Sequence, residues 1–148
     1  MRRGDTILVP LDGSASSEEV FPHIWPLVQA FSAEVILLQV ILEPTEEFAV
    51  RTSALSPPQA IRRMQMKTRT YLKSLCSKLE KEGIRASYLI REGGIPEEIL
   101  EVAAFMQANM IAMSTYGRSQ THLFLLGSVA YQVVRHSPLP VLLIRSKV

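Results

Sequence analysis

The stretch Glu34-Val35-Ile36-Leu37-Leu38-Gln39-Val40-Ile41-Leu42 decides the fold class, because it is apolar almost from end to end. A strand that shows one face to water alternates apolar and polar side chains, whereas a strand covered on both faces loses that alternation. The run is also far shorter than the ~18 apolar residues that a membrane span needs. Residues 34–42 therefore predict a strand buried on both faces, as in a parallel sheet.

Four further short apolar runs alternate with longer segments of helical periodicity. The additional strands are expected at residues 6–10, 85–91, 109–113 and 140–144. The helices are expected at residues 16–31 and 58–82, from Pro96 onward, and from near Ser128 to before Pro138. Alternating strands and helices with crossover-length connections predict an α/β, three-layer, Rossmann-like fold, in which helices cover both faces of a five-stranded parallel sheet.

Local signals predict how two of these helices begin and end. Ser16 and Glu19 have the spacing of a capping box, which satisfies two amides at a helix start. Pro22 and Pro26 each remove an amide donor and crowd the preceding turn, so the first helix should be kinked or start late. Gly83 is suited to the end of the second helix.

Composition bounds the class of protein. The 148 residues predict one domain over residues 1–148, and 16 basic against 14 acidic side chains leave a net charge of +2. That balance argues against nucleic acid or an anionic membrane as a partner. A single cysteine, Cys76, excludes an internal disulfide framework and favours a reducing compartment. With no signal peptide at the amino terminus, we expect a cytoplasmic protein.

Two segments have open interpretations. The helix expected at residues 58–82 carries seven lysine or arginine side chains off its apolar face, and we interpret that run as a solvated surface rather than a binding surface. The long irregular stretch at residues 43–57 is either a functional flap or simply disordered.

Candidate binding residues follow the first and fourth strands, where ligands of open α/β sheets bind. Asp12 comes after the first strand. Gly117 follows the fourth, and Gly127 and Ser128 open the last helix, where backbone N–H groups and the helix dipole favour an anion such as phosphate. The structural alternatives are a plain turn at Gly117, a simple helix cap at Ser128 and an Asx-turn at Asp12.

The strand order can be predicted if Asp12 and the glycine segment, from Gly117 to Ser128, form one site. Strands 1 and 4 must then be neighbours, and the order 3-2-1-4-5 achieves this. The fifth strand becomes an edge, although its residues are all apolar and lack the charge or proline that protects an edge. We therefore expect a two-fold dimer in which this strand pairs with a second copy. The interface residues are Val141, Leu142, Leu143 and Ile144.

Gly117 and Gly127 are separated by nine residues and followed by Ser128, which is similar to the glycine signature Gly-x2-Gly-x9-Gly-Ser/Thr of the universal stress protein family. Ser114 stands where that signature has its first glycine; its Cβ would crowd a phosphate loop, or its hydroxyl would add a donor. The resemblance extends over nearly the whole chain. The other segments that resemble the family are residues 7–14, 35–40, 94–100 and 138–144.

The resemblance implies a homodimeric universal stress protein that binds ATP, with or without Mg²⁺, as a regulatory ligand. It places Asp12 at the ribose and Val40 and Met113 at the adenine, with the glycine segment at the phosphates. The nucleotide-binding residues implied are Pro10, Leu11, Asp12, Val40, Met113, Ser114, Gly117, Arg118, Ser119, Gly127, Ser128 and Val129. A dimeric interaction protein without nucleotide is the second hypothesis, and a slow ATPase or phosphotransferase is the third.

Enzymatic and metal functions have little support in the sequence. His23, His122 and His136 lack the mutual spacing of metal ligands. No Gly-x4-Gly-Lys motif supplies a phosphate-binding lysine, and no Gly-x-Ser-x-Gly motif supplies a hydrolase nucleophile. We therefore expect a binding protein with no resident metal and no catalytic residues.

Overall fold

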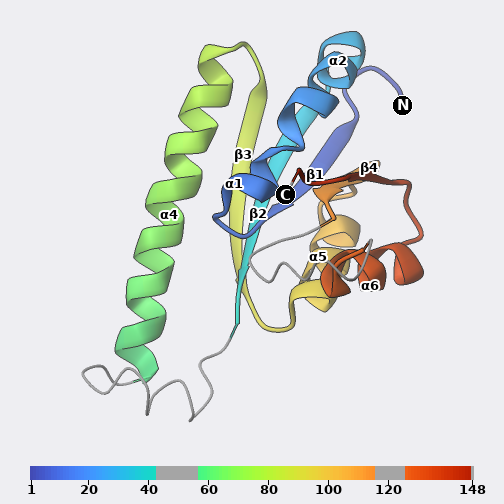
Figure 1. The fold of residues 1–148 in the computed structure, drawn as a ribbon. Coiled ribbons are helices and arrows are strands. Elements are labelled where there is room, and N and C mark those ends of the chain that lie inside the picture. The colour runs from blue at the N-terminus through green and yellow to red at the C-terminus, as the bar shows by residue number, and fades with distance from the viewer. Residues whose placement is uncertain (43–56, 116–125, 148) are drawn as a thin grey trace.

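The computed structural model describes residues 1–42, 57–115 and 126–147 (Figure 1). Its five parallel strands form one sheet in the order β3-β2-β1-β4-β5, which confirms the predicted topology. The strands are β1 (Thr6–Leu11), β2 (Glu34–Ile41), β3 (Arg85–Glu92), β4 (Met110–Ser114) and β5 (Val141–Ile144). The helices are α1 (Ala15–Glu18), α2 (Phe21–Phe31), α4 (Pro57–Lys81), α5 (Ile95–Phe105) and α6 (Ser128–His136).

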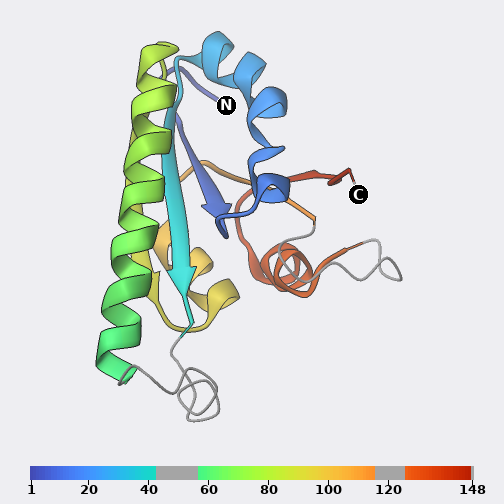
Figure 2. The ribbon, with the colours of Figure 1, turned by 60° about the vertical axis from the view of Figure 1, so that its left-hand side comes forward.

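Both faces of the sheet carry a hydrophobic core, which explains why the central strands lose polar alternation. Ile7 and Val9 of β1 point to the side of α2 and α4, whereas Leu8 between them points to the side of α5 and α6. Leu37 and Leu38 of β2 divide in the same way, and both are fully buried. Figure 2 shows α4 running alongside β2 and β3, with α5 and α6 on the other side of the sheet.

The first predicted helix is two helices, and its predicted cap is wrong. Ser14, not Ser16, caps α1, because its side-chain oxygen accepts a hydrogen bond from the Ser17 amide at 3.2 Å. The expected disturbance of this helix is a break: α1 begins at Ala15 and ends at Glu18, and α2 begins at Phe21. Pro22 then falls in its first turn, where no amide donor is needed.

The helix predicted at residues 58–82 is α4, and its predicted end is confirmed. Gly83 adopts a φ of +83°, a left-handed conformation that costs glycine little. The amide of Ile84 donates to the carbonyl of Leu79, and the amide of Gly83 donates to that of Glu80. This hydrogen-bond pattern is a Schellman motif.

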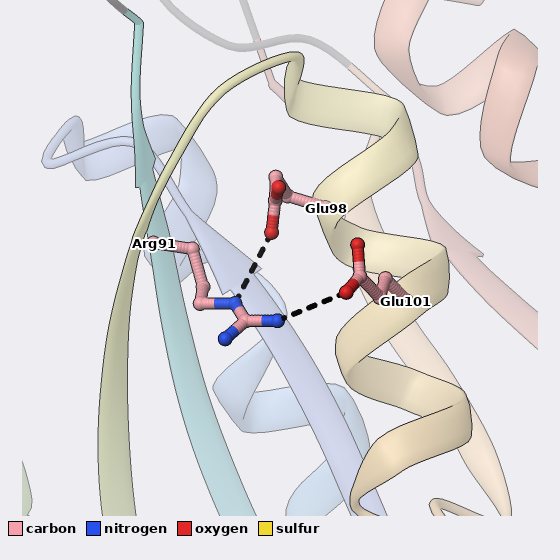
Figure 3. Close-up of polar contacts among 3 residues, drawn as sticks. All are labelled: Arg91, Glu98 and Glu101. Carbon is pink, nitrogen blue, oxygen red and sulfur yellow. Dashed lines mark hydrogen bonds and ion pairs between the residues drawn. The ribbon is translucent and has the colours of Figure 1, made fainter.

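The turn from β3 into α5 is held by an ion-pair cluster at the edge of the sheet. Arg91 of β3 donates from Nε to Glu98 at 3.1 Å and from a terminal nitrogen to Glu101 at 3.4 Å (Figure 3). Between them, Gly93 adopts a φ of +138°, which side chains rarely tolerate. Because these pairs are partly exposed, each contributes about 0–1 kcal/mol to stability.

Candidate functional site

The carboxyl ends of β1, β2 and β4 lie side by side. Leu11 of β1 pairs with Gln39 of β2, and Leu8 of β1 pairs with Ile111 of β4. Asp12 directly follows β1, so it lies at the same edge of the sheet as Val40 near the end of β2. The topology thus brings together residues that are far apart in the sequence, such as Leu8 and Ile111.

Asp12 belongs to a compact turn between β1 and α1. Its Oδ1 accepts hydrogen bonds from the Ser14 amide at 2.9 Å and from the Ser14 hydroxyl at 2.5 Å. The Ser17 hydroxyl donates to the Ser14 carbonyl at 2.8 Å and closes the turn. The Asx-turn alternative is therefore confirmed. The turn fixes the half-buried carboxylate at the strand end.

The amino end of α6 is tied to the end of β4. The Gly127 amide donates to the Thr115 carbonyl at 2.8 Å, and the Thr115 amide donates to the Ile144 carbonyl at 2.9 Å. Gly127 is the N-cap of α6, has an extended backbone and makes no side-chain cap hydrogen bond. Because the N-cap residue is a glycine, it has no side chain to cap the first amides of α6, which include those of Ser128 and Val129.

Three predicted side chains share the α5 and α6 face of the sheet. Val40 and Met113 belong to the hydrophobic cluster on that face. Pro10 pairs with Leu38 of the same cluster, so its ring points the same way. Val40 is half-buried, whereas Met113 is 5% exposed. Pro10 and Met113 are buried, so Val40 is the partly accessible apolar side chain of the three.

Two predicted residues point to the opposite face. Leu11 lies in the cluster beneath α2 and α4. Ser114 pairs with Ile144 of that cluster and is 7% exposed, so its Cβ and hydroxyl point away from the Pro10 side of the sheet.

The remaining predicted residues divide into two groups. Gly117, Arg118 and Ser119 lie outside the described residues. The four interface residues form β5 at the edge of the sheet, where Ile144 is buried within its own chain and the other three are half-buried.

Sequence reasoning missed the residues that hold this site in place. Ser14 and Ser17 fix the Asp12 turn, and the backbone of Thr115 anchors Gly127. The Asp-x-Ser spacing of an Asx-turn was a usable signal for Ser14. A backbone anchor such as that at Thr115 leaves no signal in side-chain chemistry.

A tyrosine of α4 is hydrogen-bonded to α1 on the α2 and α4 side of the sheet. The Tyr71 hydroxyl donates to Glu18 of α1 at 2.8 Å. Burial, the hydrogen bond to Glu18 and the negative charges of Glu18 and Asp12 all raise the pKa of Tyr71 well above its ordinary value. The phenol is therefore neutral and acts as a hydrogen-bond donor that links α4 to α1.

The part of the chain that the structure describes holds neither a cluster of metal-binding side chains nor a membrane-spanning helix. No three histidine, cysteine, aspartate or glutamate side chains converge there as a metal site would require. None of the described helices is long and apolar enough to cross a membrane.

Residues 4–145 match the universal stress protein family. The chain belongs to the universal stress protein family. The solved structure of the family protein MJ0577 of Methanocaldococcus jannaschii is 29% identical and has a TM-score of 0.81. The match covers 97% of this chain and 96% of that one.

Two more distant solved structures share the fold and contain nucleotides. A universal stress protein in complex with cAMP is 19% identical with a TM-score of 0.66, over 98% of this chain and 99% of that one. A family protein from Arabidopsis thaliana with AMP bound is 17% identical with a TM-score of 0.66, over 97% of this chain and 92% of that one.

Proposed function

We propose that this universal stress protein binds an adenine nucleotide, ATP in particular, at the carboxyl ends of β1, β2 and β4. One observation carries the proposal: the hydrogen bond from the Gly127 amide to the Thr115 carbonyl holds the amino end of α6 at the end of β4, next to the end of β1. Exposed amides and the positive end of a helix dipole attract phosphate. The AMP and cAMP found in proteins of the same fold support an adenine nucleotide.

In this proposal, different residues contact the base, the ribose and the phosphates of the nucleotide. Val40, which is half-buried, offers apolar surface to an adenine base, next to the buried side chains of Met113 and Pro10. Asp12, which is fixed by Ser14, is the acceptor for the ribose hydroxyls. The amides of Ser128 and Val129 receive the phosphates, beside Gly127, whose own amide is bonded to Thr115, and together with Gly117, Arg118 and Ser119 of the preceding segment.

Asp12, the carboxylate proposed for this site, is better suited to an Mg²⁺ ion that enters bound to ATP than to a metal ion held by the protein alone. Mg²⁺ at nucleotide sites keeps several waters and takes one or two carboxylates together with phosphate oxygens. Asp12 is the predicted site carboxylate at these strand ends, and its Oδ1 already accepts two hydrogen bonds from Ser14. We therefore propose that any Mg²⁺ is held mainly by the phosphates and by water.

The proposed role of ATP is regulatory rather than catalytic. Nucleotide that contacts both the Asp12 turn and α6 favours the conformation in which the two are held together, and so shifts the population of states that partners encounter. The chain has no phosphate-loop lysine to organise phosphoryl transfer. We propose a cytoplasmic binding protein that responds to nucleotide, not an ATPase.

We also propose a homodimer through β5. This strand lies at the edge of the sheet and carries only apolar residues, three of which remain half-buried in the single chain. Pairing with a second copy would satisfy the free backbone edge and cover these side chains. Light scattering should give twice the mass of the chain, and a monomer mass at micromolar concentration would contradict the proposal.

Calorimetric titration with ATP and Mg²⁺ tests the nucleotide proposal. The protein should bind saturably, and Gly127→Asp should abolish binding because it places a carboxylate at the phosphate position. Gln132→Glu adds the same charge at an exposed position further along α6 and should preserve most of the affinity. An absence of saturation at nucleotide concentrations of about 1 mM, equivalent to less than about 4 kcal/mol of binding, would refute it.

A further inference from the structure

The charge of the protein is distributed unevenly. Helix α4 carries seven basic side chains and one acidic side chain, so its net charge is +6. The rest of the chain carries nine basic and thirteen acidic side chains, a net charge of −4, although the whole chain is nearly balanced. A helix with this much positive charge attracts anionic partners at long range.

Part of that charge lies along one line on the outside of α4, which we call the α4 stripe. Its members are spaced three and four residues apart, which places them on one helix face. The stripe consists of Gln59, Arg62, Arg63, Met66, Lys67, Thr70 and Tyr71, and an open hollow runs along it. The inner face of α4 is occupied by Leu72, Leu75 and Leu79, which pack on the sheet. Figures 1 and 2 show α4 at the outside of the molecule.

The stripe combines cations with an exposed apolar side chain. Arg62, Arg63 and Lys67 are exposed, and no carboxylate among the described residues forms an ion pair with any of them. Met66 lies between them and is 71% exposed. Methionine is flexible and polarizable, so it adapts to a partner surface.

We propose that the α4 stripe docks an acidic, helical segment of another protein. The stripe from Gln59 to Tyr71 is about 18 Å long, which equals about three turns of a partner helix. Carboxylates on one face of such a helix would pair with Arg63 and Lys67, and an apolar residue between them would cover Met66. Charge complementarity sets the orientation and the association rate, and the apolar contact adds affinity.

Two other anionic partners fit the stripe less well. Duplex DNA is gripped by many cations that follow the phosphate backbone, whereas this stripe has three cations with a thioether among them. A helix that lies on a membrane inserts its apolar face, but the apolar face of α4 is already buried against the sheet. An acidic protein segment needs only the surface that the stripe presents.

Fluorescence anisotropy with a labelled synthetic peptide tests the proposal in full-length protein. The probe is an amphipathic helical peptide of about 18 residues that carries glutamates beside a line of leucines. It should bind measurably, whereas versions with glutamine for glutamate or serine for leucine should bind at least about tenfold more weakly. The Arg63→Glu, Lys67→Glu double variant should weaken binding by about tenfold or more.

The control changes the same charge on the same helix. Lys78→Glu, Lys81→Glu lies outside the stripe and should change affinity less than about threefold. An equal loss of peptide affinity in both double variants would show that the peptide is attracted only by the net charge of α4, and this would overturn the proposal. The absence of peptide binding at about 1 mM would also overturn it. So would tighter, stripe-dependent binding to phosphatidylserine vesicles or to duplex DNA.

Discussion

Tyr71→Phe tests how firmly α4 is linked to the turn that holds Asp12. The substitution removes only the hydroxyl that donates to Glu18 at 2.8 Å. A hydrogen bond to a charged group contributes about 1.5–3 kcal/mol, and partial exposure of this pair reduces that figure to about 1 kcal/mol. At pH 7 to 9, urea denaturation should show a free energy of unfolding about 1 kcal/mol lower in the variant.

Because of Tyr71, the free energy of unfolding should also depend on pH. The folded protein raises the pKa of Tyr71 above the value of about 10 that it has when unfolded. A raised pKa stabilises the fold fully below pH 10, and that stability is lost as the pH rises, because the unfolded state releases the proton first. The loss is at most about 1.4 kcal/mol per pH unit. The advantage of the wild type over Tyr71→Phe should therefore shrink between pH 10 and 11.

The comparison needs a second tyrosine as its control. Tyr131 on α6 is 49% exposed, so Tyr131→Phe should change the free energy of unfolding by less than about 0.5 kcal/mol at neutral pH. If the difference between wild type and Tyr71→Phe stayed constant up to pH 11, Tyr71 would not be held as a neutral donor. The proposed link between α4 and α1 would then be refuted.

Three further predictions concern stability and the site. Gln107 follows the C-cap of α5 and has a φ of +51°, so Gln107→Gly should raise the free energy of unfolding by about 1 kcal/mol in urea titrations; no gain would mean that the side chain contributes there. Leu37→Ala removes a fully buried side chain from β2 and should cost about 3–4 kcal/mol in the same assay, and a cost below about 1 kcal/mol would contradict the observed packing. Ser14→Ala removes both the α1 cap and a donor to Asp12. It should cost about 1 kcal/mol and weaken ATP binding in calorimetry, and unchanged affinity would argue against a role for Asp12 at the ribose.

The strands were predictable because burial on both faces leaves a direct trace in the sequence. Residues 34–42 are apolar in succession, and the observed β2 ends within one residue of that run. The first helix was less predictable because two valid signals competed. Ser16 and Glu19 have capping-box spacing, but Asp12 holds Ser14 in the turn and starts α1 two residues earlier than the capping box implied.

The candidate site was only partly predictable for the same reason. Asp12 and Gly127 were found because carboxylates and glycines at strand ends have recognisable chemistry. The sequence could not show that Ser114 points toward α2 and α4, since a single residue of strand alternation decides the face. The sequence also did not single out Met66, because the interest of this residue lies in its exposure among the cations of α4, which only the structure shows.

By itself, the sequence determined the order of strands and helices, the buried strands and the residue types available for binding, because hydrophobic periodicity and glycine spacing are local properties of a chain. The tertiary structure alone decided that Thr115 bonds to Gly127, that Tyr71 reaches Glu18, and that Ser114 faces α2 and α4. Each of these depends on how separate elements pack, and packing is settled by the sum of contacts over the whole molecule rather than by any single segment.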